Sequence, residues 1–201
     1  MTKTKKVLLI NTHLIYQNWS EGALNNSFIQ KAKVFFESTD FEVLYTKIED
    51  GYNLEDEVEK HMQADIIILQ TPVNWFGAPW IYKKYVDEVF NCGLAEKKFL
   101  SNDGRPKENP TGQYGSGGNL LGKKFMVCGT WNAPKEAFGN IDQKLFQGKK
   151  TEDLFLNITS SYRFCGCDIL PDYNSFDIFR SKTMAEDLEN YPKHLAKVFG
   201  L

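Results

Sequence analysis

A short aromatic segment, TPVNWFGAPW (residues 71–80), carries the side chains best suited to hold a planar ligand. It follows the apolar run DIIILQ, and its prolines and glycine disfavour a continuing strand or helix, so its aromatic side chains belong to a loop. Aromatic rings stack favourably on other flat rings. Trp75 and Phe76 therefore predict a site for the isoalloxazine ring of a flavin, whereas Trp80 is expected to pack in the core at the start of the next helix.

A second loop, TWNAPKEAF (residues 130–138), offers a matching wall and a polar edge. Trp131 is expected to flank the ring by offset stacking. The side chains of Thr130 and Asn132, together with backbone N–H groups of both loops, could hydrogen-bond the polar edge of a flavin. Both loops contain prolines, so they lose less entropy when a ligand binds.

A third loop, NTHLIYQNWSEGAL (residues 11–24), leads into a helix. Small and hydroxyl residues here let a phosphate or pyrophosphate approach the N–H groups and the positive dipole end of that helix. Ser20 could equally serve only as the helix cap, and both interpretations stay open. The loop contains neither G-x-G-x-x-G nor G-x-x-x-x-G-K-[ST], which disfavours a dinucleotide-type Rossmann site and a nucleoside triphosphatase.

No acid, base or nucleophile stands out in the sequence. His13, His61 and His194 are scattered, and we expect His61 and His194 to be solvated and His13 to be a passive hydrogen-bonding partner. Cys165 and Cys167 form a C-x-C pair without a second pair or a histidine cluster, so no metal site is expected. A site with flat walls and no evident catalytic group indicates that a bound cofactor carries the chemistry.

Strand and helix patterns alternate along the chain and predict where these loops lie. We expect strands at residues 5–11, 41–48, 65–70 and 123–131 and a short fifth strand broken by Pro171. We expect helices at residues 23–36, 54–63, 81–90 and 151–164 and a last one from Ser181, interrupted by Pro192. This alternation predicts an α/β fold, a doubly wound five-stranded parallel sheet with helices on both faces. In such a sheet the ligand lies beyond the carboxyl ends of the strands, so the three loops should converge.

Size and composition indicate one domain over residues 1–201, with a long irregular segment at about residues 91–122. The formal net charge of -2 does not favour binding to nucleic acid or to a membrane surface. Four cysteines do not make a disulfide framework in a chain of this size. The apolar run near the N-terminus is too short for a signal peptide or a membrane span, so we expect a cytoplasmic protein with no membrane insertion.

Four motifs, GAPWIYKKYVDEVF, SNDGR, QYGSGG and GKKFMVCGTWNAPKEAF, closely resemble the modulator-of-drug-activity-B branch of the NAD(P)H:quinone reductases. The resemblance covers nearly the whole chain, in the same order and with similar spacing. It implies a flavodoxin-like fold, a homodimer, and FAD rather than FMN as the cofactor. It further implies an enzyme that transfers a hydride from NADPH or NADH through flavin N5 to a quinone, in a two-electron ping-pong reaction.

The resemblance also implies a set of site residues, by matching position. The implied flavin contacts are Ser20, Gly22, Ala23, Leu24, Asn25, Ser27, Val73, Asn74, Trp75, Phe76, Tyr114, Thr130, Trp131, Asn132 and Ala133. Tyr114 and Asn132 are the expected catalytic contacts, with Tyr114 donating a hydrogen bond to the quinone oxygen. Arg105, Lys107 and Lys123 are candidates for phosphate contacts. The family commonly shows a Gly-Trp-Trp-Met-like run at residues 73–76, so this chain exchanges one indole for the amide of Asn74.

Other functions stay open at this stage. A flavin-dependent nitro- or azo-reductase would differ only in its electron acceptor. A flavodoxin-like electron carrier is typically strongly acidic, which the net charge of -2 disfavours. A transporter-regulatory subunit with this fold also stays open. The expected partners are quinone and nicotinamide small molecules and a second copy of the chain.

Overall fold

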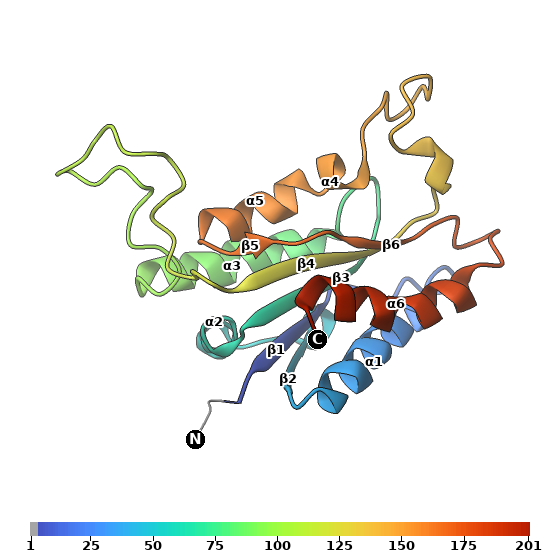
Figure 1. The fold of residues 1–201 in the computed structure, drawn as a ribbon, viewed down its shortest axis with the longest axis horizontal. Helices are drawn as coiled ribbons and strands as arrows, with labels where there is room; N and C mark the ends of the chain where they lie inside the picture. Colours follow the sequence, from blue (N-terminus) through green and yellow to red (C-terminus); the bar gives the residue numbers. More distant parts are fainter. Residues whose placement is uncertain (1–3) are drawn as a thin grey trace.

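A parallel sheet organises residues 4–201, the part of the chain that the computed structural model describes (Figure 1). Its strands are β1 (Lys6–Asn11), β2 (Glu42–Lys47), β3 (Ile66–Pro72), β4 (Lys124–Thr130), β5 (Asp168–Ile169) and β6 (Tyr173–Ser175). The strand order is β2-β1-β3-β4-β5, and every pairing is parallel. The predicted fold class is confirmed.

The fifth position of the sheet is shared by two short strands. β5 pairs with the start of β4 and β6 with its end. The break falls at residues 170–172, around Pro171, as the sequence predicts, because proline has no N–H to donate to a neighbouring strand. The chain after β6 therefore emerges at the same edge of the sheet as the chain after β4.

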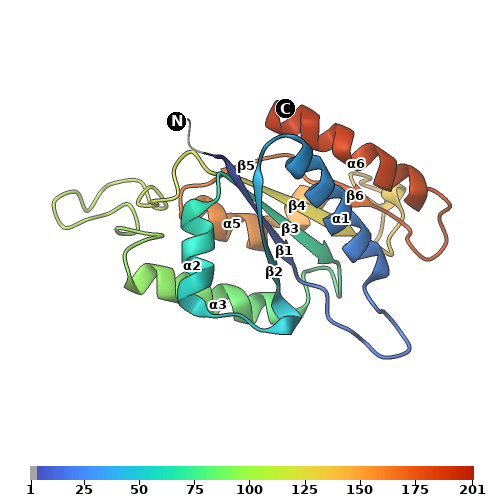
Figure 2. The same ribbon diagram turned by 90° about the horizontal axis from the view of Figure 1, so that it is seen from below.

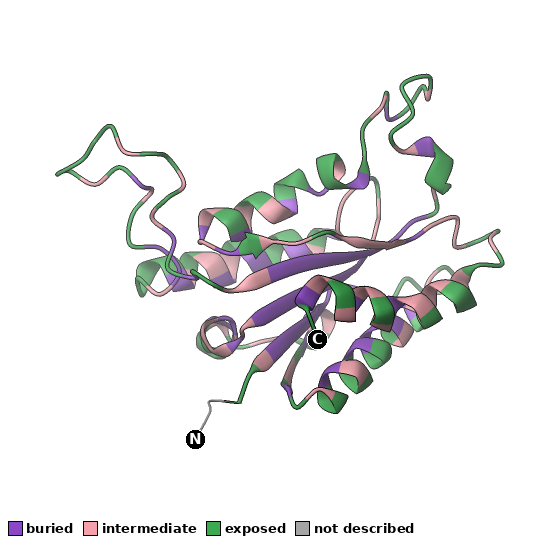
Figure 3. Ribbon diagram, viewed as in Figure 1, coloured by how far each residue is buried: buried purple, intermediate pink, exposed green. Residues whose placement is uncertain are grey.

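Helices cover both faces of the sheet (Figure 2). They are α1 (Ala23–Ser38), α2 (Leu54–Gln63), α3 (Trp80–Ala95), α4 (Thr151–Leu154), α5 (Leu156–Phe164) and α6 (Met184–Phe199), with short 3-10 turns η1 (Ile48–Asp50) and η2 (Lys135–Ala137). One apolar core lies between the sheet and α2, α3 and α5, and the other between the sheet and α1 and α6. Figure 3 shows β1, β3 and β4 buried along most of their length, which explains their continuous apolar runs.

The expected interruption at Pro192 is wrong, because α6 runs through it. Tyr191, Leu195 and Phe199 lie on one face of α6 and are buried against α1 and the sheet. This packing outweighs the backbone hydrogen bond that the proline removes.

The expected solvation of His61 is also wrong. His61 is buried in α2, its Nδ1 donates to the backbone oxygen of Glu57 at 2.8 Å, and its Nε2 lies 3.3 Å from the Tyr162 hydroxyl. The Glu57 carboxylate is buried as well and accepts hydrogen bonds from Tyr85 and Lys60, each at 2.6 Å. The polar composition of α2 thus conceals an inward-facing hydrogen-bond network.

The burial of His61 predicts a pH-dependent stability. Burial lowers the pKa of His61 from 6.5 to about 4, although the hydrogen bond to Glu57 opposes the shift. The unfolded chain therefore binds the proton more tightly than the folded chain. The contribution of neutral His61 to the free energy of unfolding should therefore be fully present above pH 6.5. The free energy of unfolding should fall by ~3 kcal/mol as the pH is lowered to 4.

Urea denaturation at a series of pH values measures this loss. The variant His61→Phe fills the same ring-lined space without a titratable group, so its stability should change much less over that pH range. Parallel curves for the natural chain and the variant would show that another group titrates.

Candidate functional site

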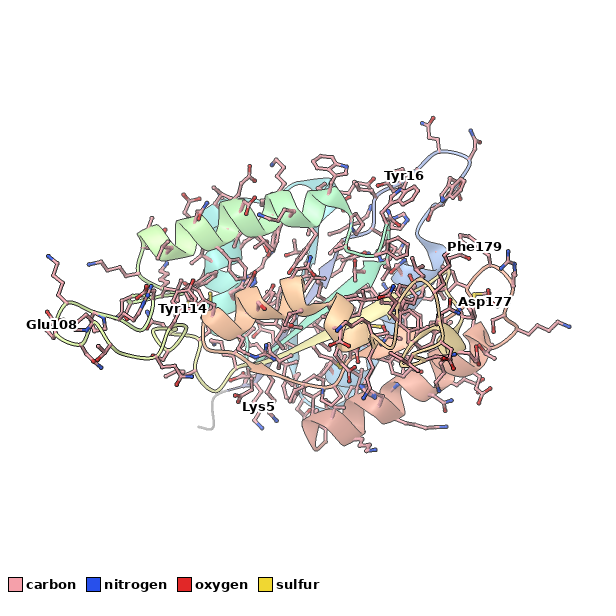
Figure 4. All side chains as sticks on the ribbon, turned by 90° about the horizontal axis from the view of Figure 1, so that it is seen from above. Lys5, Tyr16, Glu108, Tyr114, Asp177 and Phe179 are labelled. Atoms are coloured by element: carbon pink, nitrogen blue, oxygen red, sulfur yellow. The ribbon has the colours of Figure 1, made fainter. Side chains whose placement is uncertain are left out.

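A cavity of about 1440 Å³ lies at the carboxyl edge of β1, β3 and β4. The loops that follow these three strands all line it, so the predicted convergence is confirmed. In Figure 4, Tyr16 of the first loop lies at the same end of the molecule as Asp177 and Phe179, which follow β6. The cavity thus lies where the rule for doubly wound sheets places a ligand.

Buried side chains tie the three loops together. Asn25, in the first turn of α1, accepts a hydrogen bond from Nε2 of Gln70 in β3 at 2.8 Å. Its own amide donates to Oγ1 of Thr130 in β4 at 3.4 Å. Thr12 and Thr71 join the ends of β1 and β3 through their hydroxyls at 2.7 Å. Each loop therefore starts from a fixed position.

The start of α1 offers free N–H groups to the cavity. Gly22 is its N-cap, with φ of 79°, and no side chain caps the helix. The first N–H groups of a helix have no partner within the helix. Ser20 is not the cap, since its Oγ lies 3.0 Å from Nε2 of His13. A Cβ at Gly22 would lie 2.5 Å from Nδ1 of His13, so only glycine fits there.

His13 lines the cavity and is buried. Burial lowers its pKa, while nearby Glu49 raises it to a lesser degree. The imidazole is therefore neutral at neutral pH. In this state it can exchange a hydrogen bond with Ser20 but adds no positive charge for an anionic ligand.

The aromatic turn after β3 has a strained backbone. Asn74 and Gly77 exchange backbone hydrogen bonds of 2.8 and 3.2 Å, which closes a tight turn. Trp75 and Phe76 occupy its centre with φ of 50° and 70°, a region unfavourable for bulky residues. Such strain costs ~1–3 kcal/mol for each residue and clusters at binding sites. Trp75 is 94% exposed, so its ring is available to a ligand.

The burial of two tryptophans, Trp131 and Trp80, is the reverse of what the sequence predicts. Trp131 is 2% exposed; its Nε1 donates to Oδ1 of Asn174 at 2.7 Å, and its ring packs on Phe138 and Phe155. The prediction that this ring stacks on a ligand is wrong. Trp80, expected in the core, is 65% exposed and lines the cavity. Trp131 belongs to the core because residues distant in sequence surround it and already satisfy its indole N–H.

Two of the implied contacts lie away from the cavity in the single chain. Tyr114 is at the opposite end of the molecule (Figure 4), where its ring packs on Phe164 and the Arg105 guanidinium. It belongs to the long segment before β4, which begins at the opposite edge of the sheet. Ser27 lies one turn into α1 and donates to the backbone oxygen of Ala23. Neither prediction holds for a cavity built from one chain.

The suggested phosphate-binding cations are also elsewhere. Arg105 pairs with Asp103, and Lys123 donates to the backbone oxygens of Met62 and Ala64 at the start of β4. Lys107 belongs to the same distant segment as Tyr114 and does not line the cavity. The residues that the structure does bring to the cavity are Ser20, Gly22, Ala23, Leu24, Asn25, Val73, Asn74, Trp75, Phe76, Thr130, Trp131, Asn132 and Ala133.

Two further segments line the cavity without being predicted from the sequence. One, around residues 143–146, brings Phe146 to an edge-to-face contact with Phe76. The other, residues 178–184, follows β6. The predicted fifth strand was a usable signal for the second segment, because the chain after it must reach the same edge of the sheet.

Within residues 4–201, no three potential ligand side chains cluster closely enough to hold a metal ion. Burial raises the pKa of both Cys165 and Cys167 to about 12, so these thiols stay protonated at neutral pH. Over the same residues, none of the helices has the length and apolar character that a membrane crossing requires.

Comparisons with known proteins agree with the geometry. The family model described as flavodoxin-like fold matches residues 5–198. The chain is 40% identical to the NADPH:quinone oxidoreductase MdaB of Haemophilus influenzae, over 90% of this chain and 93% of that protein. A solved NADPH-quinone reductase from P. pentosaceus shares the fold with a TM-score of 0.66 and 15% identity, covering 94% of this chain and 96% of that one. General stress protein 14 of Treponema denticola, solved in complex with FMN, shares it with a TM-score of 0.65 and 16% identity, covering 96% and 98%.

The contrast between Trp131 and Trp75 predicts two different mutational effects. Trp131→Ala opens a cavity in the core and leaves Asn174 without its donor, so it should lower the free energy of unfolding by ~3–5 kcal/mol. Trp75→Ala removes an exposed ring and should change it by less than ~0.5 kcal/mol. Urea denaturation of the three proteins measures both values. Equal losses would contradict the assignment of one indole to the core and the other to the cavity.

Proposed function

The chain belongs to the flavodoxin-like fold family, in the MdaB-type branch of its oxidoreductase enzymes, and we propose that it is an FAD-dependent NAD(P)H:quinone oxidoreductase. The observation that carries the proposal is the convergence of three loops on one cavity that combines exposed indoles with free backbone donors. The likeness to the Haemophilus influenzae enzyme supports the reductant and the acceptor.

The residues of the cavity fit a flavin. The uncapped start of α1 suits a phosphate, because its N–H groups and dipole favour an anion. Asn132 is exposed at the cavity and carries an amide able to bond the polar edge of the ring. The volume of about 1440 Å³ exceeds the ~300–1000 Å³ of ordinary small-molecule pockets. It leaves room for FAD and a second planar molecule.

When bound, the flavin supplies the hydride relay between a nicotinamide and a quinone, in two half-reactions. The chain itself contributes positioning. The exposed indoles of Trp75 and Trp80 offer planes for an aromatic substrate, worth ~0.5–1.5 kcal/mol per ring pair beyond area burial. The strained turn at Trp75 and Phe76 holds one of these planes ready before the substrate arrives.

We assign Tyr114 to the site of a second copy of the chain. Its ring is 66% exposed on a segment that projects from the opposite end of the molecule (Figure 1). Because Tyr114 does not line the cavity of its own chain, its expected hydrogen bond to the quinone oxygen requires a homodimer. The exposed aromatic rim of the cavity, with Trp75 and Trp80, gives a second copy apolar surface to cover.

The cytoplasm is the proposed location. All four cysteines are free thiols, which fits a reducing compartment.

The function is tested with the purified protein. Bound pigment is released by heat and identified by mass, and the protein is then mixed with NADPH or NADH and with a menadione-like quinone. We expect FAD, loss of the flavin absorbance with the nicotinamide, and its recovery with the quinone. A colourless protein that binds neither added FAD nor added FMN would defeat the proposal. Recovery with a nitro or azo compound but with no quinone would replace the proposed acceptor.

The role of Tyr114 is tested by complementation between two variants of reduced activity. Tyr114→Phe should lower kcat/KM for the quinone by up to about tenfold, the effect of one hydrogen bond, without changing flavin affinity. Homodimers of Tyr114→Ala and of Trp80→Ala should each have low quinone reductase activity. Mixing the two variants should restore activity, because one of the two sites in each mixed dimer has both Trp80 and the tyrosine of the other copy. Absence of any recovery in mixed dimers would place Tyr114 outside the partner's site.

A further inference from the structure

The cavity has an additional wall formed by residues 177–184, between β6 and α6. Its backbone is bonded directly to the loop after β4: Asp177 donates to Ala133 at 3.1 Å, and Ile178 donates to Trp131 at 3.1 Å. Arg180 then donates its N–H to the backbone oxygen of Asp177 at 2.9 Å, which closes a turn. The position of this wall is thus fixed by the same loop that holds Asn132 at the cavity.

Arg180 gives this wall a positive charge. Among the described residues that line the cavity, it is the one lysine or arginine, and Glu21 is the one acid. Its guanidinium has no carboxylate within ion-pair distance in residues 4–201. Arg105, by contrast, is paired with Asp103. Arg180 therefore supplies a positive charge that no group of the described chain neutralises.

An exposed aromatic residue precedes Arg180 in the chain and lines the same cavity. Phe179 lines the cavity and is 64% exposed (Figure 4). An arginine and an exposed ring in the wall of one cavity suit a phosphorylated nucleoside, because the planar guanidinium binds phosphate oxygens in pairs and a ring can stack on a base. The start of α1 already provides for one phosphate. A ligand with a single phosphate therefore does not need Arg180.

Taken with the proposed function, on which this inference rests, we propose that Arg180 determines specificity by binding one adenosine-side phosphoryl group, either the adenosine 5′-phosphate of FAD or the 2′-phosphate of NADPH. FMN is the matched ligand that lacks the adenosine 5′-phosphate, and NADH, which keeps its pyrophosphate, is the matched ligand that lacks the 2′-phosphate.

The test uses three variants and four ligands. Arg180→Gln removes the charge and keeps a polar side chain, and Arg180→Lys keeps the charge without the planar fork. Lys182→Gln removes an exposed charge of the same segment that does not line the cavity, and it serves as the control. Flavin-free protein is titrated with FAD and FMN, and the reconstituted enzyme is assayed for KM with NADPH and NADH.

The charge-assisted contact predicts a selective loss. Arg180→Gln should weaken the binding of FAD relative to that of FMN, or raise the KM for NADPH relative to that for NADH, by at least about tenfold. The affected pair identifies the ligand that Arg180 contacts. Arg180→Lys should lose less, and Lys182→Gln should match the natural chain. Added salt should weaken the binding of the same ligand to the natural chain and should have little effect on its binding to Arg180→Gln.

The role of Arg180 would be overturned if Arg180→Gln changed neither the ratio of FAD to FMN affinity nor the ratio of the KM values for NADPH and NADH. An equal loss of affinity for FAD and FMN counts as an unchanged ratio. These outcomes leave the proposed function intact as long as a flavin binds. A natural chain that binds neither flavin would defeat the proposed function, and the role of Arg180 with it.

Discussion

The buried amide of Asn25 is the contact on which the site depends. It lies in the first turn of α1 and is hydrogen-bonded to Gln70 in β3 and Thr130 in β4. Moving α1 would leave buried polar groups unpaired, at a cost of ~1–3 kcal/mol each. The N-terminal end of α1 therefore keeps its place relative to the two aromatic loops. A rigid support of this kind lets Trp75 and Phe76 hold an unfavourable backbone conformation next to the cavity.

The parallel sheet separates two kinds of surface at its two edges. At the carboxyl edge, β1, β3, β4 and β6 end together, and their loops enclose the cavity. The opposite edge carries the projecting segment with Tyr114, which packs on the end of α5 through Phe164. One copy of the chain therefore displays a cavity at one end and an exposed phenol at the other. The proposed homodimer therefore requires two copies to associate with these two ends together.

The sequence predicts the fold well because the evidence for it is local. Apolar runs give the strands, helical periodicity gives the helices, and the rule for doubly wound sheets brings the loops together. The orientation of a single side chain depends on distant residues, and here local evidence fails. Trp131 is buried because Asn174 in β6 accepts a hydrogen bond from its indole N–H and the ring of Phe155 packs on it. The indole also lies close to the backbone of β4, since a Cβ at Gly129 would be 2.9 Å from its Nε1. The predicted fifth strand indicates that the chain after it reaches the cavity edge, but it does not indicate that Arg180 lines the cavity, because this depends on how β6 pairs with β4.

The central claim is that the loops after β1, β3 and β4 act together as one flavin site. Amide hydrogen exchange of the protein with and without FAD, resolved by peptide, tests it most directly. The account predicts slower exchange on loading in residues 20–25, 73–77 and 131–134 together, since each contributes N–H groups or rings to the same cavity. Protection confined to one of these segments, or found only at the opposite edge of the sheet, would contradict it.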